Sequence, residues 1–118
     1  MSYDIHLEDP VTGYVLHTET EHHLAGGNYV VGGTTELWLN ITWNYANHFY
    51  RTMGKDGVRA IYGKTGEESI PILTKAIRQL SDDIDEDYWA STEGNAKQAL
   101  CKLRVMAYLR PDGVWNGD

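Results

Sequence analysis

The chain has only one cysteine, Cys101, and only one phenylalanine among its 118 residues. A single cysteine excludes an intramolecular disulfide, so the hydrophobic core has to stabilise the fold, and a reducing compartment is expected. No segment approaches the roughly 20 consecutive apolar residues of a membrane-spanning helix, and the N-terminal residues lack the basic and apolar regions of a signal peptide. We therefore expect a single domain over residues 1–118 that is cytoplasmic and contacts no membrane.

Basic residues are scarce as well, since 10 Lys and Arg face 17 Asp and Glu and give a formal net charge of −7. Proteins that grip DNA or RNA through its phosphates need a basic face, so nucleic acid is not an expected partner. Four basic side chains cluster in sequence and form either a local basic pocket or a solvated loop: Arg51, Lys55, Arg59 and Lys64. The eight Tyr and four Trp favour a binding surface or an oligomer interface, because these side chains combine an apolar body with a polar tip.

The N-terminal residues show the alternation of half-buried strands. Apolar and polar side chains alternate over residues 2–8 and again over 14–19, and residues 9–13 between them have turn chemistry. We expect an N-terminal β-hairpin in which His6 lies opposite His17. Such a pair usually decorates a surface, and a metal site there is the less favoured alternative.

Two glycine pairs precede an aromatic, asparagine-rich stretch within residues 26–51. Glycine pairs occur where φ is positive or where another group approaches closely. Between the pairs, residues 28–31 favour a short strand. Thr34 or Thr35 is a suitable N-cap, so a helix is predicted over about 36–53, with a glycine directly after it.

Asparagine recurs at helical spacing along one face of this predicted helix. The face comprises Asn40, Asn44, Asn47 and Arg51, with His48 beside it. Asparagine is a poor helix former because its amide competes for the backbone, so a merely solvated face would carry Glu and Lys instead. Two interpretations stay open, namely amides that recognise a ligand and a structural polar network. The buried stripe is expected to comprise Leu39, Trp43, Ala46, Tyr50 and Met53.

Two further helices are predicted downstream. Thr65 and Glu68 have the spacing of a capping box for the first of them. Pro71 would then lie in the helix interior, so a start near Ser69 is an open alternative. This helix is predicted to end near residue 81. Thr92 is a suitable cap for a last helix over 93–109. The resulting fold class is α+β, with an N-terminal antiparallel β-hairpin or small sheet packed against three α-helices.

The C-terminal tail contains turn residues and Trp115, which suggests that it packs back onto the domain. Residues 58–62 between the first two helices are expected to form a short strand or an irregular segment.

Residues 82–87 are the strongest charge run in the chain, with five acidic side chains. Their alternating aspartates match the opening of an EF-hand loop, but Tyr88 stands where glycine is needed and Gly94 stands where the bidentate glutamate is needed. A solvated or capping acidic turn is the favoured interpretation.

A phosphate-binding loop is only partly represented. Gly27, Gly32, Gly33 and Thr34 follow the Walker A outline, but Gly33 replaces the lysine that contacts the β- and γ-phosphates. A nucleotide triphosphatase is therefore not expected, although glycine amides and a helix N-terminus can hold an anion without a lysine.

No catalytic signature is present in the sequence. Cys101 occupies a core-like helical position, and no serine lies in a nucleophile elbow. An acid–base pair from His22, His23, Glu36 or Glu93 would need a pocket that the sequence does not show. The sequence favours a protein that is not an enzyme and needs no cofactor.

Over nearly its whole length the chain resembles short proteins encoded by phages and prophages of Gram-positive bacteria. The resemblance lies in GGTTELWLNITWNY, IYGKTGEESIP, DDIDEDYWASTEGNAK and RPDGVWNGD. It implies no particular activity and no catalytic residues. It does imply a small acidic accessory protein inside a bacterial host cell, where some phage proteins antagonise host defences.

These observations favour a non-catalytic protein that binds a nucleotide-like small molecule, with phage sequestration of a host immune signal as the concrete hypothesis. The expected ligand-binding residues are Gly32, Gly33, Thr34, Thr35, Asn40, Trp43, Asn44, Asn47, His48 and Arg51. One alternative is an acidic inhibitor that engages a host defence protein through residues 82–87, and a second is a small hydrolase. A homo-oligomer is a further expectation.

Overall fold

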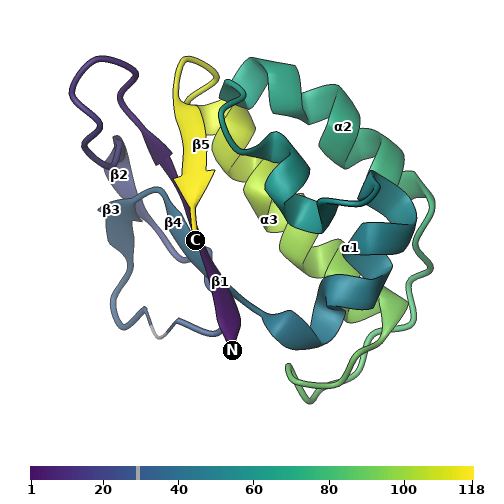
Figure 1. Cartoon of the computed structure of the whole chain (residues 1–118). Helices are drawn as coiled ribbons and strands as arrows, with labels where there is room; N and C mark the ends of the chain where they lie inside the picture. Colours follow the sequence, from purple (N-terminus) through teal and green to yellow (C-terminus); the bar gives the residue numbers. More distant parts are fainter. Residues whose placement is uncertain (29) are drawn as a thin grey trace.

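The fold consists of a small antiparallel sheet with three α-helices on one side of it (Figure 1). The structure, a computed structural model, describes residues 1–28 and 30–118. The strands are β1 (Ser2–Glu8), β2 (His17–His22), β3 (Thr34–Glu36), β4 (Trp38–Thr42) and β5 (Val114–Gly117). The helices are α1 (Ala46–Met53), α2 (Gly66–Arg78) and α3 (Glu93–Leu109), with 3₁₀ turns η1 (Trp43–Tyr45) and η2 (Gly57–Ile61). The predicted α+β class with three helices is confirmed.

Strand β1 lies at the centre of the three-stranded sheet, which has the order β4-β1-β5 with both neighbours antiparallel. Its alternation places Tyr3, Ile5 and Leu7 in the core, as the sequence pattern predicts. Ile5 lies opposite Leu39 of β4 and opposite Gly117 of β5. The first and last strands of the chain are therefore neighbours, and this pairing joins the two termini.

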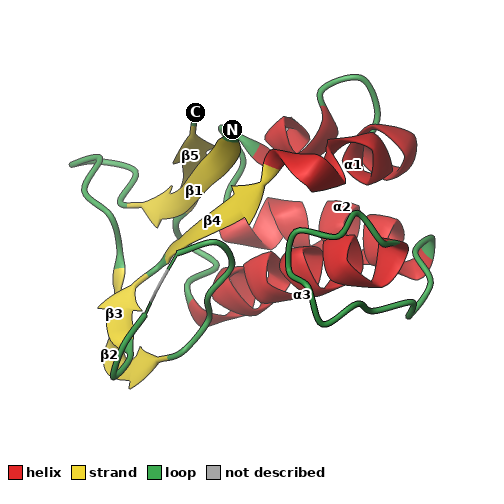
Figure 2. Cartoon of the chain, turned by 90° about the horizontal axis from the view of Figure 1, so that it is seen from below, coloured by secondary structure: helices red, strands yellow, loops and turns green. Residues whose placement is uncertain are grey.

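The predicted N-terminal hairpin forms only at its turn. Glu8 bridges Val15, and the Leu16 amide donates to the Leu7 carbonyl at 2.9 Å. Beyond that point β2 leaves β1 and pairs with β3 in a separate two-stranded sheet (Figure 2).

The predicted pairing of His6 with His17 is wrong, because His6 lies opposite Trp38 and Asn116, while His17 lies opposite Glu36. Strands β4 and β5 occupy both edges of β1, so no edge remains for β2.

The helix predicted over 36–53 is wrong over its first half. Residues 34–36 and 38–42 are strands, and neither Thr34 nor Thr35 is a helix cap. Instead the Thr42 hydroxyl accepts the Asn44 amide at 3.2 Å and caps η1, which leads into α1. Pairing of β4 with β1 buries Leu39 and Ile41, and this tertiary contact overrides the helical spacing. Asn40 therefore does not share a helix face with Asn44.

The later start of α1 also changes its buried side. Phe49 and Ala46 are buried, whereas Tyr50, predicted to be buried, is 39% exposed. Tyr45 lies in the core, and Trp43 is only partly buried. The predicted helix end is confirmed, since Gly54 follows Met53 with a φ of 98°.

Helices α2 and α3 begin at the predicted caps. Thr65 and Glu68 form a reciprocal capping box, so the alternative start near Ser69 is wrong, and Pro71 lies inside α2. Helix α2 ends at Arg78, earlier than predicted. The Thr92 hydroxyl accepts the Asn95 amide at 3.1 Å and caps α3. The side chains expected to face inward from α3 are buried: Ala96, Leu100, Leu103 and Ala107.

The C-terminal tail packs onto the domain as β5. Trp115 is fully buried, and its indole N–H donates to the buried Ser69 hydroxyl at 2.7 Å. Residues 57–61 form η2, so no strand occurs there. The strand predicted over 28–31 includes Tyr29, which lies outside the described residues, and residues 28, 30 and 31 form no strand. Within the described residues no helix is long and apolar enough to span a membrane.

Candidate functional site: the acidic loop

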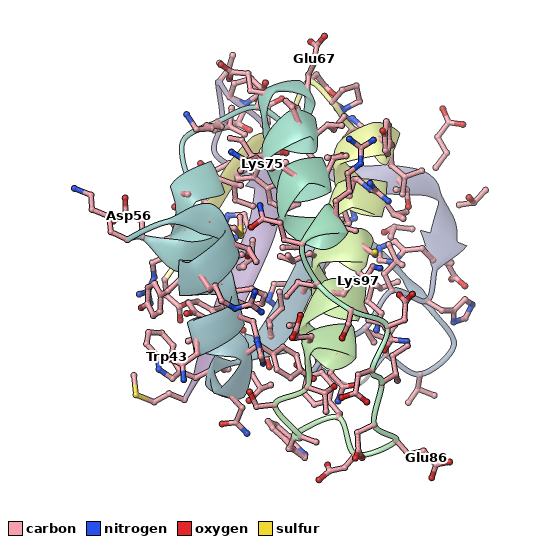
Figure 3. All side chains as sticks on the ribbon, turned by 90° about the vertical axis from the view of Figure 1, so that its right-hand side faces the viewer. Trp43, Asp56, Glu67, Lys75, Glu86 and Lys97 are labelled. Carbon is pink, nitrogen blue, oxygen red and sulfur yellow. The ribbon has the colours of Figure 1, made fainter. Side chains whose placement is uncertain are left out.

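Residues 82–91 connect α2 to α3 without regular secondary structure, and we refer to them as the acidic loop. All of its carboxylate side chains are exposed: Asp82, Asp83, Asp85, Glu86 and Asp87. Two large apolar side chains in the loop are also exposed, Ile84 at 52% and Trp89 at 53%. Glu86 projects from one end of the molecule (Figure 3). The acidic loop thus presents negative charge together with apolar surface.

Side chains from η1 and α1 hold one part of the loop backbone. The Asn44 amide donates to the Trp89 carbonyl at 2.9 Å, and His48 Nε2 hydrogen-bonds to the Ser91 carbonyl at 3.1 Å. The Tyr45 hydroxyl donates to the carbonyl of Tyr88. Three polar groups from η1 and α1, namely an amide, a phenol and an imidazole, thus hold the backbone carbonyls of residues 88, 89 and 91.

Asn95 of α3 holds the middle of the loop. Its side-chain oxygen accepts the Asp85 amide, and its side-chain nitrogen donates to the carbonyls of Asp87 and Ala90, each at 3.0 Å. Asn95 is only 4% exposed. A buried amide that makes three hydrogen bonds to one loop fixes the backbone, because few other conformations satisfy the same groups.

Helix α3 also approaches the start of the loop very closely. The Gly94 amide donates to the Asp83 carbonyl at 3.1 Å. A β-carbon at position 94 would lie 2.4 Å from the Asp83 carbonyl carbon and 2.6 Å from the Ile84 amide nitrogen. Glycine is therefore required here by the neighbouring backbone rather than by an unusual φ.

Two aspartates support the loop from within. Asp85 Oδ1 accepts the Asp87 amide at 2.8 Å, and Asp87 Oδ1 accepts the Trp89 amide at 3.0 Å. Such Asx contacts fix the local turns while the carboxylates stay accessible to solvent.

Tyr88 and Trp89 are consecutive residues with opposite roles. The Tyr88 hydroxyl accepts the Thr42 amide at 2.8 Å and donates to the Asn40 carbonyl at 3.3 Å, which attaches the loop to β4. Burial raises the pKa of Tyr88 above its ordinary value, so the phenol stays protonated and remains a donor. The Tyr88 ring points inward, and Trp89 is left on the surface.

Ion pairs lie at both ends of the loop. Arg51 is 3.3 Å from Glu93, and Lys97 is 2.7 Å from Asp82. Glu93 also accepts the Ser81 amide at 3.2 Å, and this hydrogen bond, followed by the Arg51 charge, holds the pKa of Glu93 below its usual range. Exposed pairs of this kind contribute little energy, so the buried amide contacts dominate the positioning of the loop.

The sequence-predicted ligand residues lie in three separate places. Gly32, Gly33, Thr34 and Thr35 lie at the β2–β3 sheet, where the two glycines have positive φ values of 74° and 88°. A cavity of about 200 Å³ there is lined by Val30, Val31, Gly33, Thr34, Glu36 and Trp38.

Asn40 and Trp43 form the second group, near β1. The Asn40 amide donates to the Ser2 hydroxyl and to Asp4 Oδ1, at 2.8 and 2.7 Å. The Trp43 ring stacks on Tyr3 with a centroid distance of 4.6 Å, and the Arg59 guanidinium lies 5.0 Å from the Trp43 centroid.

The third group comprises Asn44, Asn47, His48 and Arg51, from η1 and α1. All of these except Asn47 contact the acidic loop or the first residue of α3.

Arg51 and Arg59 have different surroundings, so the basic pocket considered from the sequence does not unite them. Arg51 pairs with Glu93, whereas Arg59 donates to the carbonyl oxygen of Asp118 at 2.8 Å.

The first glycine pair packs against the site without belonging to it. A β-carbon on Gly26 would lie 2.0 Å from the Asn40 carbonyl oxygen and 3.3 Å from the Tyr88 hydroxyl. The expectation that glycine pairs mark close approach or positive φ is thus confirmed at Gly26 by approach and at Gly32 by φ.

Sequence reasoning missed Asn95, Tyr88 and Trp89 as parts of the site. An asparagine three residues after the Thr92 cap was a usable signal, because a polar side chain in the first turn of a helix is close to the segment that enters it. The partners of Tyr88 lie more than 40 residues away in sequence, and no local pattern identifies them.

The acidic side chains do not converge on a common centre. Within residues 1–28 and 30–118 no group of three or more His, Cys, Asp or Glu side chains has the geometry of a metal site.

Comparison of the chain with protein-family models, curated proteins and solved structures finds no match.

Proposed function

We propose that this chain is a non-catalytic protein-binding module that docks on a basic surface of another protein through its acidic loop. The observation that carries this proposal is the contrast within the loop, whose backbone is held by Asn44, His48 and Asn95 while Ile84, Trp89 and five carboxylates face solvent.

Each part of this arrangement has a role in binding. A loop that is already ordered loses less conformational entropy on association than a mobile loop. An exposed tryptophan is the side chain most typical of an interface hot spot, and surrounding carboxylates steer a basic partner and disfavour acidic ones. The exposed Ile84 gives a second apolar anchor on the same loop.

The resemblance to phage proteins supplies the setting of the proposal. In that setting the partner is a basic surface on a bacterial host protein, and occupation of this surface inhibits the host protein. A host defence component is the partner that we propose.

Site-specific photo-crosslinking in the host cell tests this function. A photoreactive amino acid at position 84 should capture one basic protein, and the same group at Glu67 serves as the control because it is exposed at the opposite end of the molecule (Figure 3). The purified partner should then bind the wild-type chain and lose affinity for Trp89→Ala. Equal capture from positions 84 and 67, or unchanged affinity of Trp89→Ala, would overturn the proposal.

A second candidate function is the binding of a nucleotide-like small molecule at the β2–β3 sheet. The cavity of about 200 Å³ supports it, because its lining combines Gly33 and Thr34 with Trp38. This volume lies below the roughly 300–1,000 Å³ of drug-sized ligand pockets, so it suits a single ring or phosphate group. Native mass spectrometry of freshly purified protein should detect a released ligand, which Trp38→Ala should lose. An unliganded mass in both proteins would remove this candidate.

A further inference from the structure

The positive charge of this acidic chain is concentrated on two helices. After their first turns, α2 and α3 carry no Asp or Glu, although the chain has 17 acidic residues. The basic side chains on these helices are Lys75, Arg78, Lys97, Lys102 and Arg104. Lys97 pairs with Asp82 of the acidic loop and Lys102 donates to the Ala25 carbonyl. Among the described residues, Lys75, Arg78 and Arg104 form no ion pair.

The two helices form a continuous surface that also contains apolar groups. Arg104 of α3 donates to the Thr74 hydroxyl of α2 at 3.3 Å, so the sides of the helices that carry these residues are adjacent. Tyr108, one turn after Arg104, is 62% exposed. A cavity of about 420 Å³ on α2 is lined by Ile70, Pro71, Thr74, Lys75, Arg78 and Gln79. We define Ile70, Pro71, Lys75, Arg78, Arg104 and Tyr108 as the α2–α3 face.

We propose that the α2–α3 face binds the acidic loop of a second copy of this chain, which gives head-to-tail self-association. The carboxylates of the loop complement Lys75, Arg78 and Arg104. Ile84 and Trp89 match the apolar surface of Ile70, Pro71 and Tyr108. Both members of this pairing are on one chain, so charge complementarity identifies a second copy as the occupant.

In the part of the chain that the structure describes, no ion pair joins a carboxylate of the loop to Lys75, Arg78 or Arg104 of the same molecule. Asn44 and Asn95 fix the loop backbone near α1 and the start of α3. Lys75 and Glu86 lie in different parts of the molecule in Figure 3, and the ion pair between the loop and α3 is Lys97–Asp82. The complementarity therefore acts between copies.

A contact between two different surfaces is heterologous, so each pair leaves one loop and one face unoccupied. Further copies can add at both ends, and the association gives a ring or an open chain. Because this proposal rests on the proposed function of the acidic loop, its test has to separate self-association from binding to another protein.

Sedimentation velocity of the full chain with two charge-reversal variants provides that test. The face variant carries Lys75→Glu and Arg78→Glu, and the loop variant carries Asp83→Lys and Glu86→Lys. All four side chains are exposed. Circular dichroism checks that each variant is folded. The wild type should associate with increasing concentration and dissociate with added salt. Each variant alone should show at least a roughly tenfold weaker association, because like charges then meet at the contact.

Mixing the two variants gives the decisive outcome. The face variant keeps a normal loop and the loop variant keeps a normal face, so an equimolar mixture should associate again. The reversed loop of one variant also complements the reversed face of the other, so the two variants should alternate in the assembly. A chain with all four substitutions should associate again, since both charges are then exchanged. A monomeric wild type at every concentration, or no association in the mixture, would overturn the proposal. If position 84 still captures a basic host protein in that case, the proposed function stands and only self-association is wrong.

Discussion

The acidic loop and the glycine-containing segment of residues 23–28 and 30–33 are similar in length, but they are held in different ways. Side chains of neighbouring elements hold the acidic loop, through Asn44, His48 and Asn95. In the glycine segment the Gly27 amide donates to the Asn40 carbonyl at 2.8 Å, Asn28 Oδ1 accepts the Gly26 and Asn40 amides, and Lys102 donates to the Ala25 carbonyl. At Gly26 and Gly27 the absence of a β-carbon also lets the chain approach Asn40 of β4. Glycine there serves close packing.

The difference shows where to look for function. Gly26 and Gly27 pack against β4, whereas the acidic loop exposes its carboxylates, Ile84 and Trp89 while Asn44, His48 and Asn95 hold its backbone. A loop that is ordered by buried amides and still exposes a tryptophan has a surface that the fold itself does not need.

Gly94→Ala should release the acidic loop and have the largest effect. Alanine favours a helix interior by about 1 kcal/mol over glycine, but here its β-carbon would overlap the Asp83 backbone at 2.4 Å. We expect a net destabilisation of about 2–3 kcal/mol, typical of overpacking, in urea unfolding. Gln98→Ala, at an exposed position of the same helix, is the control and should cause no loss. Equal stability of Gly94→Ala and the wild type would show that α3 does not hold the loop.

Asn95→Ala should have the next largest effect, because it removes three hydrogen bonds to the loop backbone. The expected loss is about 2 kcal/mol in the free energy of unfolding. Hydrogen exchange should accelerate at the Asp85 amide, whereas exchange at Gly27 in the glycine segment should not change. A uniform acceleration over both segments would mean that the two are not held separately.

Asn44→Ala and Asn47→Ala form a matched pair, since both are exposed asparagines in neighbouring turns. Only Asn44 contacts the acidic loop, by donating to the Trp89 carbonyl at 2.9 Å. We expect a loss of about 1 kcal/mol for Asn44→Ala and a change within about 0.5 kcal/mol for Asn47→Ala, measured by thermal unfolding. Equal effects would favour a ligand-reading role for the asparagines over a structural network.

Acid should weaken the hold on the start of the loop through Glu93. The Ser81 amide and Arg51 lower the pKa of Glu93 below the ordinary 4.5 in the folded state. The stabilisation is therefore fully present above the unfolded pKa and is lost as the pH falls through the folded pKa. Glu93→Gln should be less stable than the wild type near pH 6 and nearly equal to it near pH 3, as urea midpoints would show. A stability difference between Glu93→Gln and the wild type that does not depend on pH would contradict the role of the carboxylate. Glu67→Gln is the control substitution.

The sequence predicted the elements that local chemistry determines. Thr65 and Glu68 cap α2, Thr92 caps α3 and Gly54 ends α1, because each signal acts within a few residues. Long-range contacts explain the errors. Pairing with β1 converts residues 38–42 from predicted helix to strand, and occupation of both β1 edges limits the hairpin to its turn.

The candidate site was predicted only in part. The sequence predicted a polar face with Asn40, Asn44 and Asn47 and favoured ligand binding there. The contacts of Asn44 and His48 agree with the alternative, a structural network, whereas Asn40 lies in β4. The acidic run was interpreted as a solvated or capping turn, since its spacing does not show which distant side chains hold it. That Trp89 is exposed while Tyr88 is partly buried follows from tertiary contacts to β4, which single-sequence patterns do not contain.

Backbone order parameters from ¹⁵N relaxation of the full chain test the central claim most directly, namely that the acidic loop is held in one conformation. Residues 83–91 should have order parameters of about 0.85, equal to those of α3. Values below about 0.6 over the same residues would contradict the account, because a mobile loop would not present Ile84, Trp89 and its carboxylates as one surface.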